Sequence, residues 1–434
     1  IRDRRRSRGL GDVYKRQILI ISAALNYILA FAIDKYRGKL MGKLAVFFAV
    51  FFDLAVLGIF KYSGFIAENL NALLPLNLPV PDIKLPIGIS FYTFQIISYV
   101  IDCHWEKVSV QKSFPKFLMY VSLFPQLVAG PIVRYSTIES EISSRRTTLD
   151  DLSSGVSRIA VGLAKKVILA NNLNIIVEAF FGSDIKNLSV TGTWYAVIIY
   201  AMQIYFDFSG YSDMAIGLGR IFGFHFDENF NYPFICKDVS EFWQRWHISL
   251  STFFRDYLLY VPIFGKRRKY GGLFLVWFCT GLWHGASWNY IIWGLYFGMF
   301  IFIEQLIGKK KMKKIPLAVR HIYNKIVIII GFGIFYFEDL SRLGDFFKNL
   351  IGLNSNSFID EFTKLSVTNN LYLIIIAVIC CFPVAKVIQN LAKKNIGFSY
   401  TIAASRVAVN IALLLVSSIL LVDATNNPFL YFRF

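Results

Sequence analysis

Charged residues are scarce in this sequence, and acidic residues are the scarcest. Of the 434 residues, 17% are charged, with 28 Asp and Glu against 46 Lys and Arg. A soluble domain carries about 25% charged residues, whereas 56% of this chain is hydrophobic. The composition therefore excludes an ordinary soluble domain and indicates an integral membrane protein.

The formal net charge of +18 would suit nucleic-acid binding, but its distribution argues against that function. The basic residues gather in short loops between apolar runs, as in "GKRRKYGG" (265–272) and "GKKKMKK" (308–314). Short basic loops mark the cytoplasmic side of a membrane protein. We expect both loops to face the cytoplasm, and we expect membrane lipids as partners and no nucleic acid.

Cysteine is also scarce, and the sequence lacks the usual metal and nucleotide motifs. The five cysteines contain no C-x-x-C pair, so they predict neither a disulfide framework nor a zinc site. There is no H-E-x-x-H, G-x-S-x-G, phosphate-binding glycine loop or dinucleotide fingerprint. We therefore expect no permanently bound metal or cofactor.

What the sequence has in abundance is apolar runs. They cover residues 18–33, 44–60, 85–101, 117–133, 156–180, 194–205, 273–283, 288–303, 322–337, 371–388 and 402–422. Because some are short or merge with a neighbour, we predict about ten membrane spans, plus or minus two. Lipid requires every backbone amide to bond within its own segment. The fold class is thus an all-α polytopic membrane protein.

The first 17 residues, "IRDRRRSRGLGDVYKRQ", differ from the rest of the chain. They hold seven basic and two acidic residues, with too little apolar surface to offset an ordering cost of about 1–2 kcal/mol per residue. We predict that residues 1–17 are a disordered leader, foreign to the fold and without packed contacts. Without a convincing internal repeat, residues 18–434 should form a single transmembrane domain whose motif-bearing core is 205–300.

Three segments are expected to connect the apolar runs. The Pro-rich segment 73–85 should lie in the membrane interface. Residues 136–154 read as a polar connection with a short amphipathic helix on the membrane surface. Residues 349–368 read as a polar loop.

The central region carries most of the intramembrane polar residues. Asp207 and Asp213 interrupt an apolar, Gly-rich span, and intramembrane acids usually face the bundle interior with a partner. Residues 240–265 form an amphipathic stretch that predicts an interfacial or re-entrant helix carrying His247. A plainer interpretation is an interfacial belt of aromatic and charged side chains, which explains the tryptophans but not His284.

His284 and His247 stand apart from the other three histidines. His104, His225 and His321 lie beside loop charges and are expected at the surface or at helix ends. An imidazole within hydrocarbon must find a partner or lose about 2–7 kcal/mol. A neutral imidazole held there has the pKa range expected of a general base.

Each of these two histidines lies in a long motif, "RWHISLSTFFRDYLLYVPIFG" (245–265) and "GLWHGASWNYIIWGLYFG" (281–298). In that order, the two motifs resemble the signature of the membrane-bound O-acyltransferase family, in the bacterial branch that includes alginate O-acetyltransferases. Further similar segments are "FPQLVAGPIVRY" (124–135), "GLAKKVILAN" (162–171), "YFDFSGYSDMAIGLGRIFGF" (205–224), "ENFNYPF" (228–234) and "NPFLYFRF" (427–434). The likeness runs from about residue 18 to the end, and related chains begin with further apolar helices. Teichoic-acid D-alanyl transfer proteins are less similar.

The resemblance implies a ring of tilted transmembrane helices, with re-entrant or interfacial helices, around a central tunnel. His284 matches the catalytic histidine of the family, and His247 matches a second histidine of the same tunnel. Substrate contacts are expected from polar and aromatic residues of these motifs, namely Asp207, Ser209, Tyr211, Asp213, Trp246, Arg255, Asp256, Trp283 and Asn289. Donors for the oxyanion stay open between Asn289, Trp N–H groups and His247.

The implied reaction moves an acyl group, most simply acetyl, from an acyl thioester (acetyl-CoA or an acyl carrier) to a sugar hydroxyl. The expected partners are a glycan acceptor, a donor or carrier protein on the cytoplasmic side, and a secreted or anchored acetyl-transfer protein. The expected location is the bacterial cytoplasmic membrane. Alternatives are D-alanyl transfer to teichoic acid, a lipid or sugar transporter, and an inactive structural partner.

Overall fold

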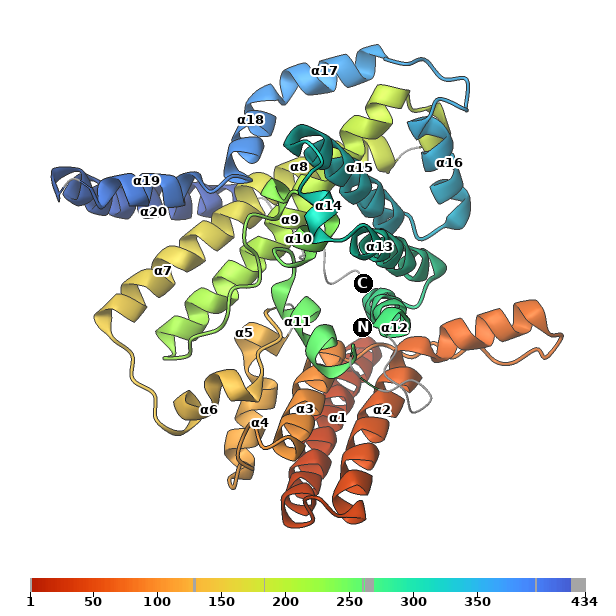
Figure 1. The fold of residues 1–434 in the computed structure, drawn as a ribbon, viewed down its shortest axis with the longest axis vertical. Helices are drawn as coiled ribbons and strands as arrows, with labels where there is room; N and C mark the ends of the chain where they lie inside the picture. The colour runs from red at the N-terminus through yellow and green to blue at the C-terminus, as the bar shows by residue number, and fades with distance from the viewer. Residues whose placement is uncertain are drawn as a thin grey trace. The chain divides into compact units, whose positions relative to one another are not determined.

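The computed structural model describes residues 2–127, 130–182, 184–259, 261, 269–394 and 396–422. Side chains are described from residue 16 onward, except those of residues 396, 398, 399 and 403. All regular secondary structure in these ranges is helical (Figure 1), which confirms the predicted all-α fold. The chain divides into two compact units, Ile1–Leu152 with Leu218–Asp227, and Ser153–Gly217 with Glu228–Phe434.

The first unit is built on three packed helices. Its elements are α1 (Arg2–Lys35), α2 (Leu40–Leu73), α3 (Ile89–His104), α4 (Phe114–Ser122), α5 (Phe124–Leu127) and α6 (Tyr135–Ser143). Asn26 Nδ2 of α1 donates to Asp53 Oδ1 of α2 at 3.0 Å, so the carboxyl group that lies within apolar helix α2 has a hydrogen-bond partner. Phe47 and Phe51 remain exposed on α2, as expected of a lipid-facing surface.

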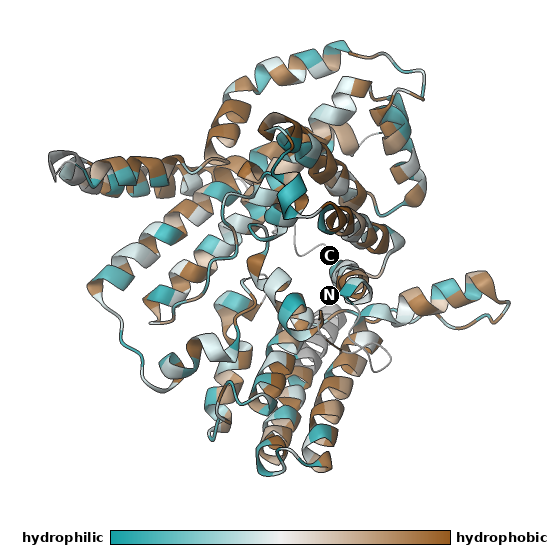
Figure 2. Cartoon of the chain, in the orientation of Figure 1, coloured by the Kyte–Doolittle hydropathy of each residue, from teal (hydrophilic) through white to brown (hydrophobic). Residues whose placement is uncertain are grey.

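The second unit begins within α7 (Leu149–Ala164) and contains the helices that follow, except the last residues of α9. They are η1, a π-helix (Lys165–Ala170), α8 (Asn171–Phe181), η2 (Ile185–Asn187), α9 (Val190–Ile221), η3 (Pro233–Ile235), α10 (Val239–Trp243), α11 (Ile248–Tyr257), α12 (Lys269–His284), α13 (Trp288–Ile307), α14 (Lys309–Met312), α15 (Leu317–Tyr336), α16 (Leu340–Leu350), α17 (Glu361–Asn369), α18 (Leu371–Cys380), α19 (Val384–Ala392) and α20 (Ile396–Val422). Figure 2 shows that hydrophobic residues dominate α13, α15 and α18.

Fewer helices span a membrane than the sequence predicts. Among the described residues, six helices are long and apolar enough to cross a membrane, or seven if the bent pair α17 and α18 makes one span. The prediction of about ten was too high because α3 and α12 have only 16 residues each, short of the ~20 that a span needs. The run at 194–205 belongs to α9, whose acidic residues and tyrosines make the helix too polar to be counted as a membrane span. The polytopic membrane fold itself is confirmed.

One of the predicted connections differs from the structure, and the others do not. Part of the predicted polar loop 349–368 is helical, because α17 begins at Glu361 with Asp360 as its cap. The amphipathic helix predicted in 136–154 is present as α6, and residues 74–85 form an exposed extended loop. The backbone of the basic leader belongs to α1. Whether the leader packs is outside the description, since the side chains of residues 1–15 are not included.

Helices α12 and α13 form a tight hairpin that carries His284. A Cβ added at Gly281 would overlap the carbonyl oxygen of Tyr290, and one at Gly294 would overlap that of Trp277. Glycine at these positions lets the two backbones touch, the usual way in which membrane helices pack closely. The end of α12 is therefore fixed against α13.

Candidate active site

The two acids of α9 are each held by a lysine from the preceding helical segment. Asp207 accepts a hydrogen bond from Lys166 Nζ at 2.5 Å, and Asp213 accepts one from Lys165 Nζ at 2.7 Å. The lysines are consecutive, and consecutive side chains of an α-helix diverge by about 100°. They lie in the π-helix η1, whose wider turn lets both reach α9. The expectation that these acids are partnered is met.

Arg158 extends this network from α7. Its guanidinium donates to Asp213 at 2.8 Å and to Glu228 at 2.8 Å, so three cations balance three carboxylates in the network. Helices α7 and α9 approach closely here, as shown by Gly162, where an added Cβ would overlap the carbonyl oxygen of Gly210. Such a balanced network holds α7 and η1 against α9.

The stretch predicted as one re-entrant helix is two short helices with a break before Ile248. At the break, His247 has a left-handed backbone, with φ 45° and ψ 53°, which costs a non-glycine residue roughly 1–2 kcal/mol. Asn229 supports this turn from a separate segment. Its carbonyl accepts the Ile248 N–H at 2.9 Å, and its Oδ1 accepts the Ser249 N–H at 3.2 Å. Asn229 thus caps the first N–H groups of α11.

The His247 imidazole is enclosed by side chains from two helices, α9 and α12, and from the connection that carries Asn229. Its Nδ1 lies 3.2 Å from Asn229 Oδ1, and Phe208 of α9 presents an edge to the ring at 4.7 Å between centroids. The ring also lies 5.7 Å from that of Trp283. His247 is 1% exposed, and this burial lowers the pKa of its imidazole well below the usual value. The ring is therefore neutral near pH 7.

His284 is the last residue of α12 and lies in an aromatic shell. The ring centroids of Trp283 and Trp293 are each 4.9 Å from its own, and that of Phe335 is 5.1 Å away. His284 is 8% exposed, so it is buried within the protein. Trp283 contacts both histidines, which brings two distant parts of the sequence to one aromatic side chain.

Hydrogen-bond donors near His284 are few. Asn289 Nδ2 donates to the carbonyls of Ile334 and Phe335, each at 3.3 Å, so Asn289 has only its oxygen left for a ligand. The indole Nε1 of Trp293 is buried and has no hydrogen-bond partner among the described residues. Among the donor groups considered from the sequence, the Asn289 amide is thus engaged by backbone carbonyls, and the Trp293 indole N–H is not engaged by a described residue.

Trp246 and Ser209 lie in the surrounding core. Trp246 packs against Phe230 and Phe332, at 5.1 and 5.2 Å between ring centroids, within the aromatic core of the second unit. Ser209 of α9 is 1% exposed, and its Oγ has no hydrogen-bond partner in the described part of the chain. Tyr211 is half-buried on the same helix.

Arg255 and Asp256 form an ion pair with each other on α11. Arg255 Nε lies 2.7 Å from Asp256 Oδ1, and the Arg255 side chain is 57% exposed. The pair stands about two helical turns from His247. These two residues thus lie on the outer part of the helix that His247 begins.

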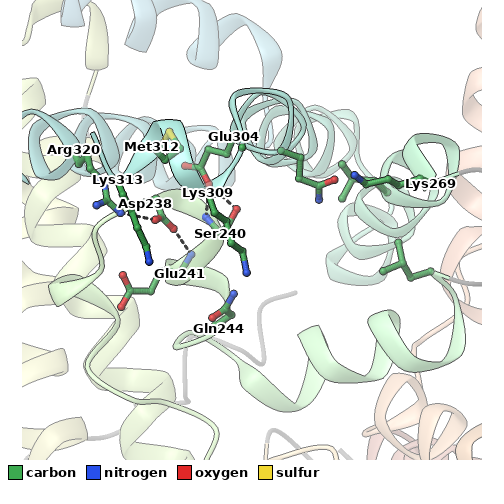
Figure 3. A pocket seen from close by; sticks show the side chains of 14 residues that line it. Asp238, Ser240, Glu241, Gln244, Lys269, Glu304, Lys309, Met312, Lys313 and Arg320 are labelled. Atoms are coloured by element: carbon green, nitrogen blue, oxygen red, sulfur yellow. Dashed lines mark hydrogen bonds and ion pairs between the residues drawn. The ribbon is translucent and has the colours of Figure 1, made fainter. Parts of the chain in front are cut away.

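A cavity of about 940 Å³ lies beside α10, α13 and α14, and Figure 3 shows its lining. Its charged lining residues are Asp238, Glu241, Glu304, Lys269, Lys309, Lys313 and Arg320. Its three lysines belong to the two basic loops of the sequence, 265–272 and 308–314, and Arg320 follows the second loop. Residues 262–268 are outside the description.

The acids of this cavity are engaged by neighbouring groups. Asp238 pairs with Arg320 at 2.9 Å, and Glu241 pairs with Arg245 at 2.8 Å. Glu304 accepts the backbone N–H groups of Val239 and Ser240 at 2.7 and 2.9 Å. Three lysines remain, Lys269, Lys309 and Lys313, and none makes an ion pair with a described residue. The cavity therefore offers positive charge to a ligand.

Sequence reasoning missed Lys166, Asn229 and Ser212, whose hydroxyl accepts a hydrogen bond from Asn229 Nδ2 at 3.1 Å. It considered Trp293 only as one of several indole N–H groups. All four fall within segments that carry the family resemblance. Two signals were present: a pair of lysines in an apolar run, and the asparagine between Glu228 and Phe230 in "ENFNYPF". Neither signal identifies a partner, because each partner lies elsewhere in the chain.

Comparisons with known proteins agree with the resemblance. The model of the membrane-bound O-acyltransferase family matches residues 44–343. The chain is 36% identical over 410 residues to a Pseudomonas putida protein named probable alginate O-acetylase AlgI, covering 88% of this chain and 82% of that protein. It is 31% identical over 375 residues to the peptidoglycan O-acetyltransferase of Helicobacter pylori, covering 78% and 71%.

A third relative is the teichoic acid D-alanyltransferase of Bacillus subtilis, 31% identical over 248 residues, which cover 53% of this chain and 62% of that protein. The two O-acetyltransferases are thus matched over more of both chains than the D-alanyltransferase. Because the family model covers more than half of the sequence, this multi-pass membrane chain belongs to the membrane-bound O-acyltransferase family.

Proposed function

We propose that this enzyme transfers acetyl groups to hydroxyls of an extracytoplasmic polysaccharide or cell-wall glycan, in the bacterial cytoplasmic membrane. The names of its relatives support acetyl as the group and a glycan as the acceptor. The observation that carries the proposal is the pair of buried imidazoles, His247 and His284, both in contact with Trp283.

The proposed step is attack of a sugar hydroxyl on the thioester carbonyl. His284 takes the hydroxyl proton as the C–O bond forms, and the tetrahedral oxyanion collapses with loss of the thiolate, which takes up that proton. A positioned general base of this kind contributes about 10²–10⁴-fold. The Trp293 indole N–H is the proposed donor to the oxyanion, because it is buried beside His284 and has no partner in the described residues.

The donor proposed for this step is an acyl thioester that carries phosphate, such as acetyl-CoA or an acyl carrier. Lys269, Lys309 and Lys313 line the same cavity without ion-pair partners among the described residues, and they would attract the phosphates. The positive-inside distribution of Lys and Arg supports a cytoplasmic donor side. A glycan acceptor, lipids, and a secreted or anchored acetyl-transfer protein are the proposed partners.

The test uses the full chain in vesicles, with labelled acetyl-CoA outside or inside and soluble glycan on the opposite side. Wild type should move label to the glycan, whereas His284→Gln should not, since an amide is no base. His321→Gln, at a histidine outside this site, should retain transfer. Substantial transfer by His284→Gln would remove the general-base role.

The same assay separates the alternatives. Label appearing from a D-alanyl thioester, but not from acetyl-CoA, would favour D-alanyl transfer to teichoic acid. Unmodified glycan crossing the vesicle without acylation would favour a transporter. If label reaches the glycan only when a secreted protein is added, this chain would catalyse one of several acetyl-transfer steps.

A further inference from the structure

The orientation of the Asn229 side-chain amide is fixed by groups with a single hydrogen-bonding role. The backbone N–H of Ser249 can only donate, and it points at Asn229 Oδ1 from 3.2 Å. The Ser249 hydroxyl reaches the same oxygen at 2.9 Å. On the other side, Asn229 Nδ2 donates to the hydroxyl of Ser212, on α9, at 3.1 Å. The atom that faces His247 is therefore the amide oxygen.

This orientation determines which nitrogen of His247 carries the proton. Nδ1 lies 3.2 Å from Asn229 Oδ1, and an amide oxygen can only accept, so Nδ1 must be the donor. In a neutral imidazole the other nitrogen is then an acceptor. That nitrogen, Nε2, is buried and has no hydrogen-bond partner among the described residues.

We propose that Asn229 is a positioning residue that holds His247 as the Nδ1–H tautomer, so that Nε2 accepts a hydrogen bond from a hydroxyl of the acceptor. The inference rests on the proposed function for its substrate, but the tautomer is a property of the chain alone. It assigns His247 to the hydroxyl side of the reaction, because neutral Nε2 has no proton to donate to an oxyanion. His284 remains the base in this arrangement.

The same asparagine also caps α11, so a merely structural role must be separated from control of the tautomer. Ser249→Ala is a matched control, since it removes a hydroxyl from the same Oδ1 while the Ser249 backbone N–H and the His247 contact remain. Asn229→Asp keeps an acceptor for Nδ1–H and the cap. Asn229→Ala removes both, and losing a cap costs about 0.5–2 kcal/mol.

The experiment is nitrogen-15 NMR of the full chain in detergent, labelled at histidine, with His247 assigned from its loss in His247→Gln. Wild type, Ser249→Ala and Asn229→Asp should show a protonated Nδ1 and an unprotonated Nε2. Asn229→Ala should show a mixture or the opposite tautomer. A wild-type His247 protonated at Nε2 would overturn the proposal, whether or not any variant folds.

A second readout follows acetyl transfer against pH. Asn229→Ala should lower kcat by about tenfold or more, up to the roughly 10²–10⁴-fold that a positioned proton acceptor contributes. Asn229→Asp should retain transfer, with its acidic limb moved to higher pH because a carboxylate beside His247 favours the imidazolium. Unchanged kcat in Asn229→Ala, with the Nδ1–H tautomer kept, would contradict the proposal. If wild type shows the tautomer but transfers no acetyl, only the proposed function fails.

Discussion

On α9, the two buried carboxylates each lie within 2.8 Å of a lysine or arginine. Around α12 and α13, by contrast, buried polar atoms are left without partners in the described part of the chain: Trp293 Nε1, Asn289 Oδ1 and, on the adjoining turn, His247 Nε2. Both regions place polar groups among apolar helices. The two carboxylates of the first region are paired within the protein, whereas these three atoms of the second region are not.

The difference indicates what each region is for. Burying a charge is tolerable when it is paired and hydrogen-bonded, and the α9 network meets that condition. A buried donor or acceptor without a partner destabilises the fold by about 1–3 kcal/mol. Such atoms are expected where a ligand will satisfy them. We therefore expect substitutions in the α9 network to affect stability and substitutions around His284 to affect turnover.

The largest expected effect would break the paired region. Lys166→Met leaves the Asp207 carboxylate buried without its lysine, and breaking a buried pair costs about 3–5 kcal/mol. We expect a large drop in the thermal midpoint of the detergent-solubilised chain. The double variant Lys166→Met with Asp207→Leu should recover most of the loss, because neither charge of this buried pair remains. Equal instability of the single and double variants would show that the network does not act as a pair.

A smaller or comparable effect, on rate alone, is expected at Trp293. Trp293→Phe keeps an aromatic ring but deletes the indole N–H, and loss of one oxyanion donor lowers kcat about 10²–10³-fold. Acetyl transfer should fall accordingly while the thermal midpoint stays near that of wild type. Trp243→Phe is the matched control, since its indole Nε1 is also buried without a described partner. An equal loss of transfer in both variants would point to lost packing instead.

The fold and the site differ in how far the sequence predicted them. Membrane helices and the pairing of Asp207 followed from composition, because hydrocarbon imposes both. The number of spans did not, since a 16-residue helix such as α3 has the same apolar character as a longer one. His284 and His247 were identified by their tryptophan neighbours and by the family motifs.

The arrangement around His247 lay beyond sequence reasoning. The break before Ile248 depends on hydrogen bonds from Asn229, which lies in another segment, so no local sequence pattern predicts the break. Ser209 and Tyr211 were expected to contact substrate, but Ser212 makes the hydrogen bond to Asn229. Tyr211 and Ser212 are consecutive on α9 and point to different sides, whereas Ser209 lies on the same face as Ser212. A side chain's partner is set by packing, which periodicity alone does not give.

A third prediction sharpens the comparison by testing a part of the site that is held by packing and not by charge. Gly294→Ala places a methyl group against the carbonyl of Trp277, and overpacking costs about 1–3 kcal/mol. The thermal midpoint and acetyl transfer should both fall, because α12 and α13 must separate. Gly344→Ala, on α16 where an added Cβ meets nothing within 4 Å, should be neutral or stabilising. Similar midpoints for the two variants would contradict the tight hairpin.

The smallest expected effect extends the pairing rule to an exposed histidine of the first unit. His225 Nδ1 lies 2.7 Å from Glu141, and Nε2 lies 3.1 Å from Asp151. Hydrogen bonds to Glu141 and then Asp151 raise the pKa of His225 above its usual value. Because the folded-state pKa exceeds the unfolded value of about 6.5, the stabilisation is full below about pH 6.5 and is lost as pH rises through the folded-state pKa.

The His225 side chain is 52% exposed, so screening keeps the effect small and sensitive to salt. Wild type should lose more thermal stability than His225→Gln as pH is raised from about 6, and salt should narrow the gap; parallel curves would mean that the two carboxylates do not hold the imidazolium.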